Sequence, residues 1–139
     1  MAADLKKLVE RFNDEVLSQG KVEVIDELVH DDLIEHTEVP GVDPGKAGIP
    51  QYVKMFRDAF PDLKVTTDAV VVEGDEVWVQ STMTGTHKGE FMGIPATGKK
   101  VSVAGFDRVK TKDGKAIEHW GMTDDLGMMT QLGVVPEMG

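Results

Sequence analysis

The sequence predicts an α+β fold in which helices cover one face of a curved antiparallel sheet and enclose a small-molecule pocket. The first observation is that apolar residues recur at helical spacing up to about residue 60 and at strand spacing from residue 63 onward. The second is that two turn signals divide the later part into two long hairpins. No linker or repeat interrupts the chain, so residues 1–139 are expected to form one domain.

Three helices are predicted in the first half of the chain. The first is amphipathic, and its apolar residues are Leu5, Leu8, Val9, Phe12 and Val16. A second, shorter helix follows at about 22–29, and a brief extended piece covers 33–37. Pro50 near a helix start and Pro61 just past a helix end bracket the third helix.

Four strands are predicted in the second half, at residues 63–73, 76–87, 101–111 and 116–123. The turn sequences EGD and KDGK join them in pairs, because glycine beside an acidic residue is typical of a hairpin turn. A glycine-rich connection, GEFMGIPATGKK, separates the two hairpins. A short helix from about Asp125 to Leu132 is expected to end at Gly133.

The charge balance excludes some classes of partner. The chain has 15 basic and 25 acidic residues and a net charge of −10, and it contains no cluster of Lys and Arg. An acidic surface of this kind repels nucleic-acid phosphates and anionic lipids. We therefore expect neither nucleic acid nor a membrane as a partner.

The chain has no cysteine, which excludes disulfides, thiolate zinc sites and a cysteine nucleophile. No apolar run approaches the roughly 20 residues needed to cross a bilayer. The N-terminal sequence MAADLKKLVERF has the pattern of an amphipathic helix and lacks the apolar stretch of a signal peptide. These features favour a cytoplasmic location.

Two segments carry a resemblance to a known family: GTHKGEFMGIPATGK at residues 85–99 and EHW…DDLG…QLG at 118–133. Both resemble the SnoaL-like polyketide cyclase and ester cyclase family of the nuclear-transport-factor-2-like superfamily. The resemblance implies a cone-shaped curved antiparallel sheet with three N-terminal helices on its concave face. It also implies aldol-type ring closure without a cofactor or metal, and often a homodimer formed through the sheet.

The resemblance implies that the aspartate ending the EHW strand is the catalytic general acid and base, and Asp124 matches that position. Strand alternation puts Asp124 on one sheet face with Glu118, Trp120 and Met122. Trp120 and Met122 would then supply an apolar setting in which the protonated carboxyl is favoured. The alternative is that Asp124 only caps the last helix, because aspartate is a preferred N-cap residue.

His36 is the second catalytic candidate, since the resemblance implies a polar pocket residue in the extended piece after the second helix. Its ring could orient a substrate carbonyl or hold an enolate oxygen by a hydrogen bond. The indole N–H of Trp120 could act in the same way. The alternative is that His36 is a surface residue of a loop.

Four further residues are expected to bind substrate. Phe12, Tyr52 and Phe56 face inward on their helices, where they either fill the core or line the cavity, and Tyr52 also offers a hydroxyl group. Arg108 would bind a substrate carboxylate if strand pairing aligns it with Trp120. A solvated or interface arginine is the alternative.

The remaining histidines receive structural interpretations. His119 has the opposite strand parity to Asp124, so it is taken as a structural or interface residue unless a bulge at Gly121 turns it inward. His87 in the GTHKG motif is interpreted as loop or interface architecture. Neither the HExxH pattern of a helical metal site nor the GxSxG elbow of a serine hydrolase is present, so no metal is expected.

Two functions follow from the sequence and the resemblance. The first is cofactor-free acid/base catalysis on a small, apolar, polyketide-like carbonyl compound, by aldol-type cyclisation or a related isomerisation. The second is a non-catalytic module of the same fold that binds a small ligand or associates with partners. A homodimer is expected in either case, because the convex sheet face would otherwise expose a large apolar patch.

Overall fold

The computed structural model describes residues 2–134. Its helical elements are α1 (Ala2–Arg11), the π-helix η1 (Phe12–Ser18), the 3-10 helix η2 (Val22–Val24), α2 (Ile25–Leu28), α3 (Gly48–Ala59) and α4 (Asp125–Leu132). Its strands are β1 (Val29–Glu35), β2 (Lys64–Glu73), β3 (Glu76–Thr86), β4 (Lys100–Lys112) and β5 (Lys115–Thr123). The two hairpins and the last helix therefore lie where the sequence predicts them.

The five strands form one curved sheet in the order β1-β5-β4-β3-β2. Strands β2 to β5 pair antiparallel, as predicted. Residues 33–35 of the extended piece expected at 33–37 belong to a longer strand, β1, which pairs parallel with β5 and makes the sheet mixed. Val29 was expected to end the second helix, but it begins this strand. Its exposed fraction is 2%, so the apolar residue that continues the helical pattern is a buried residue of the strand.

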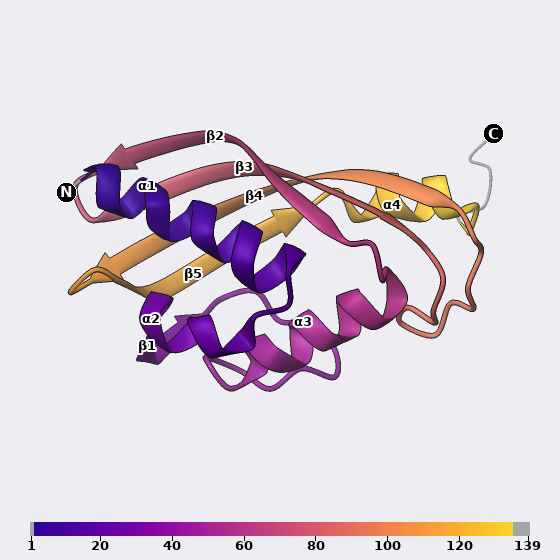
Figure 1. Ribbon diagram of the computed structural model, residues 1–139, viewed down its shortest axis with the longest axis horizontal. Coiled ribbons are helices and arrows are strands. Elements are labelled where there is room, and N and C mark those ends of the chain that lie inside the picture. Colours follow the sequence, from indigo (N-terminus) through magenta and orange to yellow (C-terminus); the bar gives the residue numbers. More distant parts are fainter. Residues whose placement is uncertain (1, 135–139) are drawn as a thin grey trace.

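The helices lie on the concave side of the sheet, which confirms the predicted cone-shaped α+β fold. In Figure 1 the strands β2, β3 and β4 arch across the molecule, and α3 lies beneath the arch. The helix α4 follows β5 at the opposite end of the sheet from α2 and the start of β1. None of the helices within residues 2–134 combines the length and the apolar character that crossing a membrane requires.

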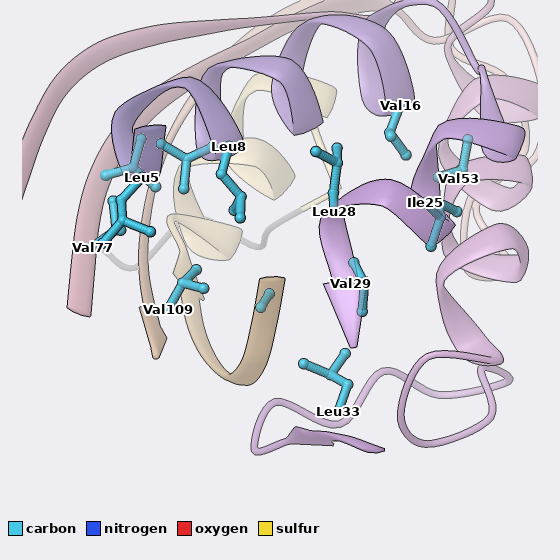
Figure 2. Packing of buried hydrophobic residues seen from close by; sticks show 13 residues of the cluster. Leu5, Leu8, Val16, Ile25, Leu28, Val29, Leu33, Val53, Val77 and Val109 are labelled. Atoms are coloured by element: carbon cyan, nitrogen blue, oxygen red, sulfur yellow. The ribbon is translucent and has the colours of Figure 1, made fainter. Parts of the chain in front are cut away.

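Two hydrophobic clusters fill the space between helices and sheet. The first joins α1, α2, β1 and the valines of β3 and β4, and Figure 2 shows Leu5 and Leu8 directed toward Val77 and Val109. Burying a side chain of this size contributes about 1.5–3 kcal/mol to stability. This cluster fixes the N-terminal helices against one half of the concave face.

The second cluster is aromatic and lies between α3, α4 and the other half of the concave face. Phe56, Phe60 and Phe91 pack with ring centroids 5.0 to 6.5 Å apart, and Met128 and Leu132 of α4 are buried beside them. The glycine-rich connection contributes Phe91 to this cluster. A strip of polar and small residues separates the two clusters on the sheet.

The strand register decides which sheet face the helices cover. In β3, Val77 and Val79 are buried, whereas Trp78 between them has an exposed fraction of 51%. Through β4 this register reaches β5, where His119 pairs with Val109 on the covered face and Trp120 pairs with Arg108 on the open face. The sequence interpretation had assigned Trp120 to the covered face, and that assignment is wrong.

Candidate active site

A polar band crosses the covered face of the sheet between the two hydrophobic clusters. Ser81, Gly105 and Thr123 form one row across β3, β4 and β5. Asp107 and Gly121 form the next row, and His119 follows on β5. Because alternate strand residues point to the same face, all of these positions lie on the side of the helices, although Thr123 at the end of β5 is exposed. Polar side chains at the centre of a covered face need partners within the protein or in a ligand.

His119 is held between two carboxylates. Its Nδ1 lies 2.6 Å from Oε2 of Glu35, and its Nε2 lies 2.8 Å from Oδ1 of Asp107. Glu35 stands opposite His119 in the parallel pair of β1 and β5. Asp107 reaches the ring from β4 on the other side. The three strands thus bring together three ionisable groups that are far apart in the sequence.

The carboxylates keep His119 charged. Burial by itself lowers the pKa of a histidine, but the hydrogen bonds to Asp107 and Glu35 and the attraction of their charges raise the pKa of His119 to about 9. At neutral pH the ring is therefore an imidazolium that donates both of its N–H groups. The trio of His119, Asp107 and Glu35 has a net charge of −1 in that state.

The two carboxylates differ in how firmly they are held. Oε2 of Glu35 accepts from His119 and also from the backbone N–H of Thr37, at 3.2 Å. The hydroxyl of Thr37 in turn accepts from the N–H of Gly121 at 2.7 Å, which ties the end of β1 to β5. Neither Oδ2 of Asp107 nor Oε1 of Glu35 has a hydrogen bond within the part of the chain that the structure describes. The side chain of Asp107 is the more exposed of the two, at 34% against 22% for Glu35, so a ligand reaches Asp107 more easily.

Tyr52 of α3 packs, partly buried, against the aromatic cluster, near enough to the trio for the charges of Asp107 and Glu35 to act on its hydroxyl. Its ring packs against Phe56 with centroids 4.6 Å apart. Burial, followed by the nearby negative charges of Asp107, Asp125 and Glu35, raises the pKa of the Tyr52 hydroxyl. The group therefore stays a neutral phenol, which can donate a hydrogen bond at any physiological pH.

The other two inward aromatics fill the core. Phe12 packs against the first hydrophobic cluster and Phe56 is buried in the second. Phe56 also packs against the ring of Tyr52. Their contacts show core packing, and a role of the same residues in lining a cavity stays a prediction.

Asp124 lies outside the polar band. It is exposed, and its Oδ1 accepts a hydrogen bond of 2.9 Å from the backbone N–H of Gly127 in the first turn of α4. The expected apolar setting beside Trp120 and Met122 is therefore wrong. The contact is that of a helix N-cap, which satisfies one of the free N–H groups at a helix start.

The remaining expected site residues gather on the open face. Trp120 lies between His36, whose ring stacks on it at 4.5 Å, and Arg108, whose guanidinium lies 4.1 Å from its ring. His36 also pairs with Glu118 at 2.5 Å. Met122 has an exposed fraction of 79%. The expected placement of His36, Glu118, Trp120 and Met122 in a covered pocket is wrong, because all four lie on the open face. Arg108 pairs with Trp120 as its expected role required, but it does so on the open face, where it also pairs with Glu76.

His87 has a structural position, in line with its sequence interpretation. It is fully buried beside Phe60, with ring centroids 5.4 Å apart. Its Nδ1 accepts from the backbone N–H of Thr97 at 3.2 Å, which fastens the glycine-rich connection to the end of β3.

Sequence reasoning missed Glu35 and Asp107. A signal for Asp107 was present, since it has the same strand parity as Val101, Val103 and Val109, and a carboxylate within a buried valine series is unusual. No comparable signal existed for Glu35. Its position depends on the parallel pairing of β1 with β5, which joins segments about 80 residues apart.

Two surface hollows lie away from the polar band. One, of about 650 Å³, runs between the first helix and β2, and the other, of about 600 Å³, lies between α2 and Lys46. An enclosed pocket above His119 therefore stays a prediction. Within residues 2–134 no group of three or more His, Asp or Glu side chains is arranged to hold a metal ion.

The fold and the trio define a class: a cone-shaped α+β protein with acid/base groups on the covered face of its sheet. The family model of the SnoaL-like polyketide cyclases matches residues 7–132. The chain belongs to the SnoaL-like polyketide cyclase family.

Individual relatives agree with this assignment. Nogalonic acid methyl ester cyclase of Streptomyces nogalater is 26% identical over 82% of this chain and 87% of its own length. Aklanonic acid methyl ester cyclase of Streptomyces peucetius is 27% identical over 93% of this chain and 88% of its own length. The structure of TsrD from Streptomyces laurentii superposes with a TM-score of 0.89 at 30% identity, and covers 97% of this chain and 98% of TsrD.

Proposed function

We propose that this protein is an enzyme that closes a ring in a small polyketide-like carbonyl compound by an aldol-type cyclisation, without a cofactor. The observation that carries the proposal is the imidazolium of His119 held between Asp107 and Glu35 on the covered face. Membership in the family and the names of the two cyclase relatives support the substrate class. Asp107 takes the role that the sequence analysis gave to Asp124.

The reaction needs one base and two groups that stabilise negative charge. Asp107 removes a proton from the carbon next to a carbonyl, which breaks the C–H bond and leaves an enolate. The enolate carbon attacks a second carbonyl of the same molecule, so a C–C bond forms and an alkoxide appears. The protonated Asp107 returns the proton to that alkoxide, and the product is an isomer of the substrate.

His119 and Tyr52 have supporting roles in this scheme. The charge of the His119 imidazolium stabilises the enolate through space and holds Asp107 in place. The neutral hydroxyl of Tyr52 donates a hydrogen bond to the carbonyl under attack. Glu35 keeps His119 protonated and fixes its ring plane, since it binds the nitrogen opposite Asp107.

A second function is favoured by the same contacts. Both nitrogens of His119 are already paired with carboxylates, and paired charges of this kind also occur in purely structural networks. The protein would then bind a small apolar ligand between sheet and helices without converting it. Proton abstraction separates the two functions, because only the enzyme removes a proton from carbon.

Two substrates and one probe test the proposal. The methyl esters of nogalonic and aklanonic acid, on which the relatives act by name, are incubated with the protein and analysed by liquid chromatography and mass spectrometry. An enzyme of this kind gives a product of unchanged mass and altered retention.

In parallel, exchange of the α-protons of 2-tetralone in D₂O is followed by NMR. If neither ester is converted and exchange does not exceed the buffer rate, the binding function replaces the enzymatic one.

We also propose that the protein is a homodimer that buries the open sheet face. The support is the apolar surface of that face, where Trp78, Phe106 and Met122 have exposed fractions of 51%, 55% and 79%. Large apolar residues gathered on one face of a sheet are typical of a protein interface. The same assembly is expected from the sequence, because the convex sheet face would otherwise expose a large apolar patch.

A further inference from the structure

Asn13 is a buried polar residue of the π-helix η1 that contacts the sheet. Its exposed fraction is 7%, and its Nδ2 donates to Oγ1 of Thr67 and to Oγ of Ser81, each at 2.9 Å. The hydroxyl of Ser18 donates to the backbone oxygen of Asn13 at 2.8 Å, five residues back along the chain. π-Helical turns are rare and occur often at functional sites. The wide turn holds the amide of Asn13 against β2 and β3.

The two hydroxyls that accept from Asn13 have different positions. Thr67 is on β2, one of the two edge strands, next to a bulge in its pairing with β3. Ser81 is on β3, and its partner across β4 is Gly105. A Cβ atom placed on Gly105 would have no neighbouring atom closer than 3.6 Å. The covered face beside Ser81 therefore has room for a ligand atom.

Ser81 still has a hydrogen to donate. A hydroxyl that accepts an N–H keeps its own O–H, which needs an acceptor of its own when it is buried. The exposed fraction of Ser81 is 6%, and its hydroxyl donates no hydrogen bond to any group among residues 2–134. In the orientation that the structure shows, Nδ2 of Asn13 donates one hydrogen to each hydroxyl, so the bond between Asn13 and Ser81 leaves the hydroxyl hydrogen of Ser81 unused.

We propose that Ser81 donates its hydroxyl hydrogen to the enolate oxygen of the substrate, and that Asn13 is the residue that positions it. The inference deepens the proposed ring closure and rests on it. Asp107 lies on the covered face two residues beyond Gly105, the partner of Ser81. Such diagonal positions are about 7–8 Å apart. That spacing lets Ser81 hold a carbonyl oxygen while Asp107 removes a proton from the adjacent carbon, so the substrate is a ketone with an acidic α-carbon.

A matched pair of variants isolates this role. Ser81→Ala and Thr67→Val each remove one hydroxyl acceptor from Asn13, but only the first removes the proposed donor to the ligand. The probe is 2-naphthol, whose oxygen mimics an enolate oxygen and whose fluorescence distinguishes naphthol from naphtholate. Ser81→Ala should weaken 2-naphthol binding at least about tenfold, the effect of losing one hydrogen bond to a charged oxygen. Thr67→Val should weaken it less than about twofold.

Asn13→Asp tests the positioning role. An aspartate of the same shape accepts hydrogen bonds from both hydroxyls and so withdraws the Ser81 hydrogen from the ligand. We expect weaker 2-naphthol binding and a smaller naphtholate fraction, with an unchanged far-UV circular dichroism spectrum. Equal weakening by Ser81→Ala and Thr67→Val, or unaltered binding in Ser81→Ala, would overturn the inference. So would a wild-type protein that does not bind 2-naphthol.

The inference and the proposed function fail in different ways. If Asp107→Asn keeps full proton exchange while Ser81→Ala alone weakens 2-naphthol binding, the ring-closure proposal fails and the Ser81 subsite stands. If Asp107→Asn loses exchange while Ser81→Ala and Thr67→Val bind 2-naphthol alike, the subsite fails and ring closure stands.

Discussion

Asp107 and Gly121 are direct partners across β4 and β5, and the carboxylate of Asp107 occupies the space above Gly121. A Cβ atom at position 121 would lie 2.9 Å from Oδ1 of Asp107 and 3.1 Å from Cε1 of His119. Real Cβ contacts are rarely so short, so a side chain there would displace one of the two groups. The absence of a side chain at Gly121 is therefore what allows Asp107 to reach His119.

Gly121→Ala should break the contact between Asp107 and His119. The added methyl group displaces the carboxylate, so the pKa of His119 should fall from about 9 toward the ordinary value of 6.5. NMR titration of the His119 ring measures this shift. Gly105→Ala is the matched control on the same face, because its methyl group has no atom closer than 3.6 Å. Equal His119 titration curves for the wild type and Gly121→Ala would contradict the role of Gly121.

The stability of the protein should depend on pH through His119. Its folded pKa of about 9 lies above the value of 6.5 for a free histidine, so the protonated ring stabilises the fold. This contribution is fully present below about pH 6.5 and is lost as pH rises through about 9. We expect the urea midpoint of the wild type to fall across this range.

His119→Gln should remove most of that dependence, since glutamine does not titrate. The comparison of the two urea midpoints between pH 6 and pH 9.5 cancels the titration of all other groups. A wild-type midpoint that falls no more steeply than that of His119→Gln would show that folding does not raise the pKa of His119.

Phe106→Glu should dissociate the proposed dimer. The substitution puts a charge in the middle of the open face, where burial of an unpaired charge is strongly unfavourable. Light scattering should give twice the chain mass of 15.2 kDa for the wild type and the single-chain mass for the variant. Val22→Glu, at an exposed apolar residue of η2, is the control and should leave the dimer intact. A wild-type mass near that of one chain at micromolar concentration would refute the dimer.

The element order was predictable because local patterns determine it. The change from helical to strand spacing near residue 62 and the two hairpin turns fix β2 to β5, and these involve only neighbouring residues. The strand β1 was largely missed, since Val29 has an apolar spacing that fits a helix and a strand equally. Its pairing with β5 is a long-range contact that no local pattern contains.

The site was predicted on the wrong face for a related reason. Strand alternation shows that Trp120 and Met122 share one face and His119 takes the other, but it does not show which face the helices cover. The register with Val77 and Val109 settles that, and it is a property of the whole sheet. Apolar content was misleading here, because the open face carries large apolar residues of its own.

The central claim is that Asp107, and not Asp124, is the base. The decisive measurement is the rate of α-proton exchange of 2-tetralone in D₂O, followed by NMR for Asp107→Asn and Asp124→Asn. Asp107→Asn should lower the rate at least about a hundredfold, the low end for loss of a general base. Asp124→Asn should leave it unchanged, because asparagine caps a helix as well as aspartate does. Full exchange in Asp107→Asn, or loss of exchange in Asp124→Asn, would contradict the account.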